Sequence, residues 1–115
     1  MDLAVIILNW NKPELTRKAV DAVKIPSSLD GQIIVADNGS SDDSVEMLKG
    51  VPGIDLLSLK QNYGFAQGYN LAVSYAQERY QARYLLLLNN DAQLEEKAIE
   101  NLYSQRERAD ILSPK

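Results

Sequence analysis

The feature that most constrains the fold is an apolar run, Tyr84–Leu88, that ends abruptly at Asn89, Asn90 and Asp91. Because the run has no polar alternation, it is typical of a strand covered on both faces, as in the parallel sheets of α/β proteins. Ligands of open α/β sheets bind outside the carboxyl ends of the strands, where these three polar residues would emerge. Taken alone, Asp91 could equally begin a turn or cap the next helix.

Segments that read as strands alternate along the chain with segments of helical periodicity. Strands are expected at residues 3–8, 32–36, 54–59, 84–88 and from 111, and helices at about 13–25, 41–49, 66–79 and 95–107. The third helix is expected to turn inward an apolar face made of Phe65, Tyr69, Ala72, Val73, Ala76 and Tyr80. Such alternation implies right-handed crossovers and a mostly parallel sheet. We therefore predict one α/β domain over residues 1–115, a three-layer, Rossmann-like fold with strand order 3-2-1-4.

Three polar residues are expected to meet at one edge of this sheet. Asn9 follows the first strand, Asp37 the second and Asp91 the fourth. Carboxyl ends of parallel strands lie together, and a crevice is expected between strands one and four. Asp37 could instead be a plain turn former before Asn38 and Gly39. The convergence of the three residues nevertheless predicts a binding site.

The residue types that are missing narrow the chemistry of that site. The chain has no cysteine and no histidine, which removes thiolate nucleophiles, zinc fingers and Ser-His-Asp triads. Any metal must be held by oxygen and is therefore expected to be Mg²⁺ or Mn²⁺. The net charge of −4 and the lack of a basic stripe argue against nucleic acid as a partner. The densest basic cluster, Arg106 to Arg108, reads as a solvated helix face.

The sequence also bears on membranes. No segment approaches the roughly 20 apolar residues that span a bilayer, and the amino terminus lacks the basic start of a signal peptide. The expected location is cytoplasmic, with a full-length protein at the membrane periphery as the alternative.

The turn after the first strand departs from the usual nucleotide sites. It reads Asn9-Trp10-Asn11-Lys12-Pro13, so it has neither the G-x-G-x-x-G pattern nor a P-loop to cradle phosphates. An acid at the position of Asp37 can accept a hydrogen bond from a ribose hydroxyl or a base N–H. A metal ion on Asp91, completed by ligand phosphates and water, would supply the missing positive charge.

Four segments together resemble the family 2 glycosyltransferases, which have the GT-A fold and use nucleotide-diphosphate sugars. The segments are Val5–Asn11, Val35–Asp42, Asn62–Ala66 with Asn70, and Leu88–Asp91, in the family's order and spacing. Within the family, the motif Leu-Asn-Asn-Asp at Leu88–Asp91 most resembles a rhamnosyltransferase-like branch. The fold class implied is a GT-A half.

The resemblance assigns roles to particular residues. It implies that Leu8, Asn9 and Trp10 line the nucleobase pocket, that Asp37 binds the base or ribose, that Asn62 and Gly64 lie near the nucleotide, and that Asn70 shapes the pocket. Asn89, Asn90 and Asp91 would stand for the family's D-x-D element, with Asn90 in the nucleotide-sugar site and Asp91 binding the metal. Because Asn89 and Asn90 replace acids, fewer negative charges would face that metal.

Length is the second departure from the family. Its members continue into a half that binds the acceptor and carries the catalytic base, and no residue here matches that base. We therefore expect the donor-binding half of an inverting transferase of polysaccharide biosynthesis, inactive alone. It would take a UDP- or dTDP-linked sugar, with a saccharide or lipid-linked acceptor bound by the other half. The open sheet edge would favour self-association.

Other interpretations of the same residues stay open. The chain could be a non-catalytic nucleotide-binding or assembly module. A flavodoxin-like phosphate-acceptor domain is disfavoured, because Asn9 and Asn11 are not the acids it needs. Trp10 could be an ordinary half-buried aromatic residue, and Asn62 could merely satisfy loop backbone. Gly64 and Gly68 could serve only backbone geometry and helix packing, and Asn70 is expected to be buried and hydrogen-bonded.

Overall fold

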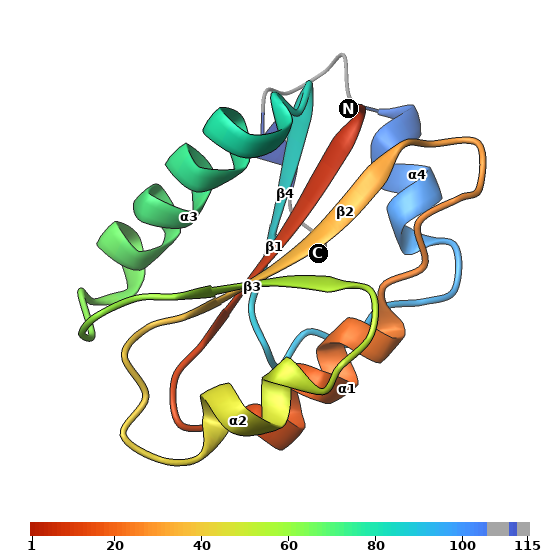
Figure 1. The fold of residues 1–115 in the computed structure, drawn as a ribbon. Helices are drawn as coiled ribbons and strands as arrows, with labels where there is room; N and C mark the ends of the chain where they lie inside the picture. Colours follow the sequence, from red (N-terminus) through yellow and green to blue (C-terminus); the bar gives the residue numbers. More distant parts are fainter. Residues whose placement is uncertain (106–110, 113–115) are drawn as a thin grey trace.

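A computed structural model describes residues 1–105 together with the backbone of residues 111–112 (Figure 1). Strands and helices alternate as the sequence predicts. The elements are β1 (Leu3–Asn9), α1 (Pro13–Ala22), β2 (Gly31–Asp37), α2 (Ser44–Lys49), β3 (Ile54–Ser58), α3 (Phe65–Tyr80), β4 (Tyr84–Leu88), α4 (Ala98–Ser104) and β5 (Ile111–Leu112).

The strands form one sheet of order β3-β2-β1-β4-β5, in which every neighbouring pair is parallel. The predicted order 3-2-1-4 is therefore confirmed, and β5 extends it. The register places Asn9 opposite Asp37 at the ends of β1 and β2. The last pair of β1 and β4 joins Ile7 to Leu88. The residues that follow these strands thus leave the sheet at the same edge.

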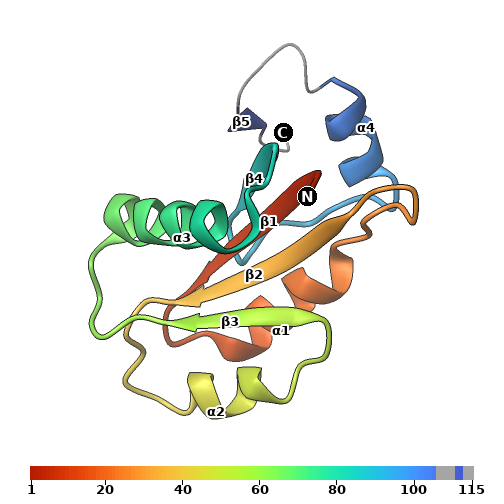
Figure 2. The ribbon, with the colours of Figure 1, turned by 45° about the horizontal axis from the view of Figure 1, so that its top comes forward.

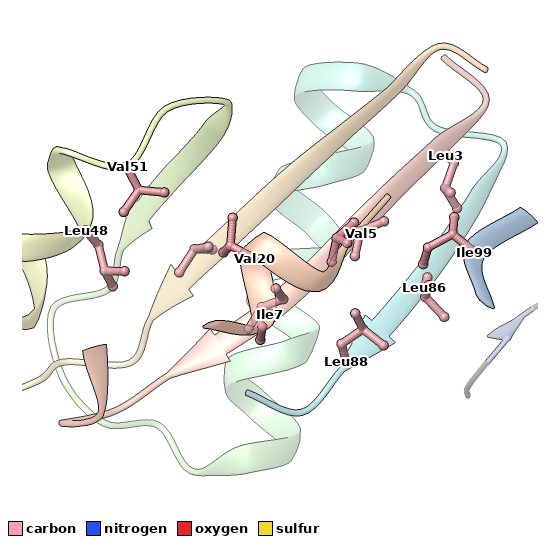
Figure 3. Packing of buried hydrophobic residues seen from close by; sticks show 12 residues of the cluster. Leu3, Val5, Ile7, Val20, Leu48, Val51, Leu86, Leu88 and Ile99 are labelled. Atoms are coloured by element: carbon pink, nitrogen blue, oxygen red, sulfur yellow. The ribbon is translucent and has the colours of Figure 1, made fainter. Parts of the chain in front are cut away.

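Alternate residues of each strand face opposite layers, which gives the predicted three-layer fold. One core cluster joins the sheet to α1, α2 and α4, and Figure 3 shows Val20 near Val5, Ile99 near Leu86, and Leu48 beside Val51. The other cluster joins the opposite face to α3, which Figure 2 shows on the other side of the sheet from α1 and α2. The central strands are covered on both faces, as an apolar run like β4 requires.

The inward face of α3 differs from the prediction at Phe65, and a separate expectation about Asn70 is also wrong. The buried residues are Gly68, Tyr69, Ala72 and Ala76. Phe65, the first residue of α3, is 64% exposed, and its ring meets that of Tyr69 edge-on at 4.8 Å. Asn70 was expected to be buried, which is wrong: it is exposed, since it lies about 100° around the helix from Tyr69.

Three helices have bounds that differ from the predicted ones by three residues or more. The first ends at Ala22 rather than near residue 25, because Val23 already has an extended backbone. The second begins at Ser44 rather than Ser41, because Ser41 belongs to a loop tied to the end of β1: its backbone N–H donates to Asn11 Oδ1 at 2.9 Å. The fourth spans Ala98–Ser104 instead of residues 95–107. Residues 106–108, interpreted above as a solvated face, lie outside the described residues. Within the described part of the chain, no helix is long and apolar enough to cross a membrane.

Candidate functional site

A cleft of about 450 Å³ opens at the carboxyl ends of β1 and β4, beside the start of α3. It is lined by Leu8, Trp10, Lys12, Asn38, Asn62, Gly64, Phe65, Tyr69, Asn89, Asn90 and Asp91. Six of the residues predicted from the sequence are thereby brought together: Leu8, Trp10, Asn62, Gly64, Asn90 and Asp91. The crevice lies at the place where the strand order reverses, which is where open α/β sheets bind ligands.

Three other predicted residues do not line the cleft. Asn9 and Asp37 are buried beneath it, with 0% and 1% of their surface exposed. Asn70 lies on the outward side of α3, because it is about 100° around the helix from the buried Tyr69.

Asp37 is held by hydrogen bonds from its neighbours. Its Oδ1 accepts from Asn9 Nδ2 at 2.9 Å and from Ser40 Oγ at 2.6 Å, and its Oδ2 accepts from the backbone N–H of Ser40 at 3.0 Å. Ser40 Oγ in turn accepts from the backbone N–H of Asn11 at 2.9 Å. The carboxylate therefore joins the ends of β1 and β2 to the loop that follows each strand.

The buried network continues from Asn9 toward the end of β4. Thr16, which is fully buried on α1, donates its hydroxyl to Asn9 Oδ1 at 2.6 Å. Asn90 Nδ2 then donates to Thr16 Oγ1 at 3.2 Å. Four side chains from β2, β1, α1 and the loop after β4 thus form one continuous chain of hydrogen bonds beneath the cleft.

Asn38 is a site residue that the sequence analysis missed. Its Nδ2 donates to Asn62 Oδ1 at 3.2 Å and to the carbonyl of Gly64 at 3.1 Å, while its Oδ1 accepts from the N–H of Tyr63 at 3.1 Å. Asn38 therefore anchors the loop that forms one wall of the cleft. Next to Gly39 it reads only as a turn former, and nothing local shows that it reaches a loop about 25 residues away.

The two glycines near this wall serve the backbone, as one of the sequence interpretations held. Gly64 has φ +81°, which few other residues adopt, and a Cβ there would meet open space. Gly68 lies so close to β1 and β2 that a Cβ would be 3.0 Å from Asn38 Nδ2 and 3.2 Å from a methyl of Leu8. The glycine at position 68 lets α3 pack directly over the floor of the cleft.

Tyr69 fixes the end of β4 from the other side. Its hydroxyl donates to the carbonyl of Leu88, the last residue of that strand. Burial raises the pKa of Tyr69 to about 12, and the nearby Asp91 carboxylate adds to this rise. The hydroxyl therefore stays protonated at neutral pH and acts as a donor, not as a base.

Among the residues that the structure describes, Asp91 is the one carboxylate that lines the cleft. It is exposed, and it makes no side-chain hydrogen bond or ion pair within residues 1–105. Lys12 contributes the opposite charge to the same cleft. The charge of Asp91 is therefore available to a ligand.

The donor set fits a hard cation only as part of a larger shell. In the part of the chain that the structure describes, no three His, Cys, Asp or Glu side chains are grouped as a metal site. Asp91 with the amide oxygens of Asn89 and Asn90 offers all-oxygen ligands, which Mg²⁺ and Mn²⁺ prefer. Phosphate oxygens and water would have to complete the coordination, as is usual for Mg²⁺.

Two aromatic side chains are exposed at the cleft. Trp10, just after β1, is 50% exposed, and Phe65, at the start of α3, is 64% exposed. An exposed aromatic ring beside a polar cleft provides a surface on which a planar ligand can stack.

Comparison with known proteins connects this geometry to a family. Residues 4–113 match the family model described as glycosyl transferase family 2. None of the curated proteins matches the chain significantly. Solved structures do match, and they share the fold at low sequence identity.

One of these structures is the mannosyltransferase PcManGT from Pyrobaculum calidifontis in complex with GDP-Man and Mn²⁺. Its TM-score is 0.76 at 18% identity, over 90% of this chain and 32% of that one. TarS 1–349 from S. aureus aligns with a TM-score of 0.72 at 14% identity, over 94% of this chain and 33% of that one. The complex of TarS 1–349 with UDP-GlcNAc aligns with a TM-score of 0.72 at 16% identity, over 94% of this chain and 32% of that one. The chain thus spans about a third of the length of these proteins.

Proposed function

The chain belongs to glycosyl transferase family 2, and on that premise we propose that it binds a nucleotide-diphosphate sugar and a divalent cation in the cleft between β1 and β4. The sugar would then be transferred to an acceptor hydroxyl with inversion. The observation that carries the proposal is the carboxylate of Asp91, which has no partner among residues 1–105 and lies in a cleft lined mainly by aromatic rings and amides. The solved complexes of PcManGT with GDP-Man and Mn²⁺, and of TarS with UDP-GlcNAc, support it.

The nucleoside would occupy the part of the cleft between β1 and the loop at residues 62–64. Leu8 and Trp10 offer an apolar surface there, and the exposed indole of Trp10 can stack on a base. Asn62 and Gly64 hold the facing wall through Asn38. Asp37 enters the proposal by fixing Asn9 and Ser40; its direct bond to a base or ribose stays a prediction, and would need one of its internal bonds to be exchanged.

The diphosphate would lie toward the end of β4. A Mg²⁺ or Mn²⁺ ion bound there neutralises charge on the departing diphosphate. Asp91 would hold the cation, with oxygen atoms from Asn89 and Asn90 beside it. Lys12 lies on the same cleft and can attract the phosphates electrostatically.

The acceptor and the catalytic base would come from outside this chain. Inverting transfer needs a base that deprotonates the acceptor hydroxyl as it attacks the sugar. Among the described residues, Asp91 is the one carboxylate lining the cleft, and the proposal already uses it for the cation. We therefore infer that residues 1–115 are the donor-binding half. Sugar transfer by this chain alone would contradict that assignment.

The function is tested by calorimetric titration of UDP, dTDP and GDP into the chain, with and without Mn²⁺. Binding is expected in the presence of the metal. Asp91→Ala should weaken it by about tenfold or more, because no other carboxylate among the described residues lines the cleft. Asp21→Ala, at an exposed position of α1 away from the cleft, is the matched control. Equal binding by the Asp91 and Asp21 variants would exclude the proposed site.

The second candidate function is a non-catalytic nucleotide-binding module, which the single carboxylate of the cleft also fits. The two are separated by joining the chain to the acceptor-binding half of a family member and assaying hydrolysis and transfer of the sugar. Self-association through the open edge of the sheet stays a prediction, which sedimentation at high concentration tests.

A further inference from the structure

The hydrogen-bond chain beneath the cleft has a fixed direction. It starts at the Asp37 carboxylate, which can only accept, and which takes donors from Asn9 and from the backbone and hydroxyl of Ser40. Asn9 must therefore turn its Nδ2 toward Asp37. Its Oδ1 is left facing Thr16 as an acceptor.

The donor and acceptor of each further hydrogen bond toward the end of β4 follow in the same way. Because Asn9 presents an oxygen, Thr16 must give it its single hydroxyl proton. Thr16 Oγ1 then has only lone pairs to offer, so Asn90 must present its Nδ2. The orientation of the half-buried Asn90 amide is thus set by the charge of Asp37, three hydrogen bonds away along this chain. Its Oδ1 is the end that has no partner within residues 1–105.

We propose that Asn90 Oδ1 is a second protein ligand of the divalent cation bound by Asp91, and that Asp37, Asn9 and Thr16 are positioning residues that hold this oxygen in place. The inference rests on the proposed function, and it concerns the side of the cleft where the cation would bind. Hard cations take oxygen ligands and gain nothing from an amide nitrogen. An amide free to rotate would offer either atom, whereas this one offers only oxygen.

This arrangement explains how a site with one carboxylate can hold a cation. Asn90 follows Asn89, which is exposed and makes no side-chain hydrogen bond among the described residues. Only Asn90 of the two amides is fixed from below. Partners that orient a metal ligand typically contribute strongly to metal affinity, although they do not touch the ion. Asn9, Thr16 and Asp37 are fully or almost fully buried, so water cannot substitute for them.

The test measures Mn²⁺ affinity by calorimetry in the presence of UDP, for the wild-type chain and for variants of Asn90 and Thr16. Asn90→Ala removes the ligand and should weaken Mn²⁺ binding by about tenfold or more. Thr16→Val has the same shape as threonine but no hydroxyl, and should weaken it by about tenfold. Thr16→Ser keeps the hydroxyl and should restore wild-type affinity. Asn101→Ala, an exposed amide on α4 away from the cleft, is the control.

A readout that needs no ligand accompanies the titrations. The side-chain ¹⁵N–¹H resonances of Asn90 should show a hydrogen-bonded amide proton in the wild type and in Thr16→Ser, and lose it in Thr16→Val. If Thr16→Val does not fold, the Asn90→Ala titration together with the wild-type resonances decides the question.

The outcomes separate this inference from the proposed function. If the wild-type chain binds no Mn²⁺ with UDP, both fall. If it binds and the affinity is the same in Asn90→Ala and Thr16→Val, the inference is overturned while the proposed function stands. If Asn90→Ala weakens UDP binding equally without Mn²⁺, Asn90 contacts the nucleotide and its role as a cation ligand is overturned.

Discussion

The ends of β2 and β4 each carry an aspartate toward the same edge of the sheet, and the two side chains have opposite surroundings. Asp37 is 1% exposed and accepts three hydrogen bonds from Asn9 and Ser40. Asp91 is exposed and has no hydrogen-bonding or ion-pair partner among residues 1–105. One carboxylate is occupied by the protein, and the other is left available.

The difference indicates that the two aspartates at this edge of the sheet have different roles. A buried carboxylate must be paired with donors, because an unpaired one is costly to remove from water. Asp37 therefore stabilises the junction of two strands and their loops. Its hydrogen-bond partners are neutral, so no positively charged side chain beside Asp37 competes for a ligand in the cleft above it. Asp91 is exposed, so its side chain is accessible to a ligand, which in the proposed function is a divalent cation.

The largest effect should come from removing the buried carboxylate. Asp37→Ala leaves the amide of Asn9 and the N–H of Ser40 without their acceptor, so we expect the free energy of unfolding to fall by about 3 to 5 kcal/mol. Urea unfolding measures this. Asp37→Asn keeps the shape and should cost less. A loss below about 0.5 kcal/mol, as at ordinary surface positions, would make the two aspartates equivalent and break the comparison.

The next effect concerns Asn38, the residue that follows Asp37. Asn38→Ala removes the side chain that holds three groups of the loop at residues 62–64, and should reduce the free energy of unfolding by about 2 kcal/mol. The amide of Tyr63 should then exchange its hydrogen faster than in the wild type. Gln61→Ala, at an exposed neighbouring position without a side-chain hydrogen bond among the described residues, is the matched control and should cost less. Equal losses would show that the loop does not depend on the end of β2.

A smaller effect is expected where α3 meets the end of β4. Tyr69→Phe removes the donor to the Leu88 carbonyl and should cost about 1 kcal/mol. The folded-state pKa of Tyr69 is raised to about 12 from an ordinary value of 10.0. The stabilisation linked to this shift is complete below pH 10 and is lost as pH rises from 10 to 12.

Urea unfolding between pH 9 and pH 12 checks that sign. The wild-type chain should lose stability more steeply than Tyr69→Phe across this range. Tyr75 and Tyr80 also have a raised pKa, mainly through burial, but they are present in both proteins and cancel in the comparison. Parallel pH profiles would mean that Tyr69 does not contribute.

The smallest change in stability should come from the exposed aspartate. Asp91→Ala should alter the free energy of unfolding by no more than about 0.5 kcal/mol, because the side chain has no described partner to lose. The same variant should nevertheless lose metal-dependent nucleotide binding, so stability and binding respond to Asp37 and Asp91 in opposite ways. A large loss of stability in Asp91→Ala would show that this carboxylate is structural as well.

Much of the fold could be predicted because its signals are local. The apolar run of β4, the β-branched run of β1 and the helical spacing of α3 each depend on residues close in the chain. The errors arose where neighbours distant in sequence decide. Phe65 fits the amphipathic pattern of α3 but is exposed, because helical spacing does not show whether another segment covers the first turn. The start of α2 moved because Asn11 holds Ser41 in the preceding loop.

The sequence by itself determined the strand order, the edge at which the site lies, and the all-oxygen chemistry open to a metal, because residue types and strand ends fix these. Only the tertiary structure decided which polar residues face the ligand. Asp37 and Asp91 follow strands in the same way, and Asn38 looks like a turn residue. Their roles depend on whether donors from distant segments reach them, and hydrogen bonding across the folded chain settles that.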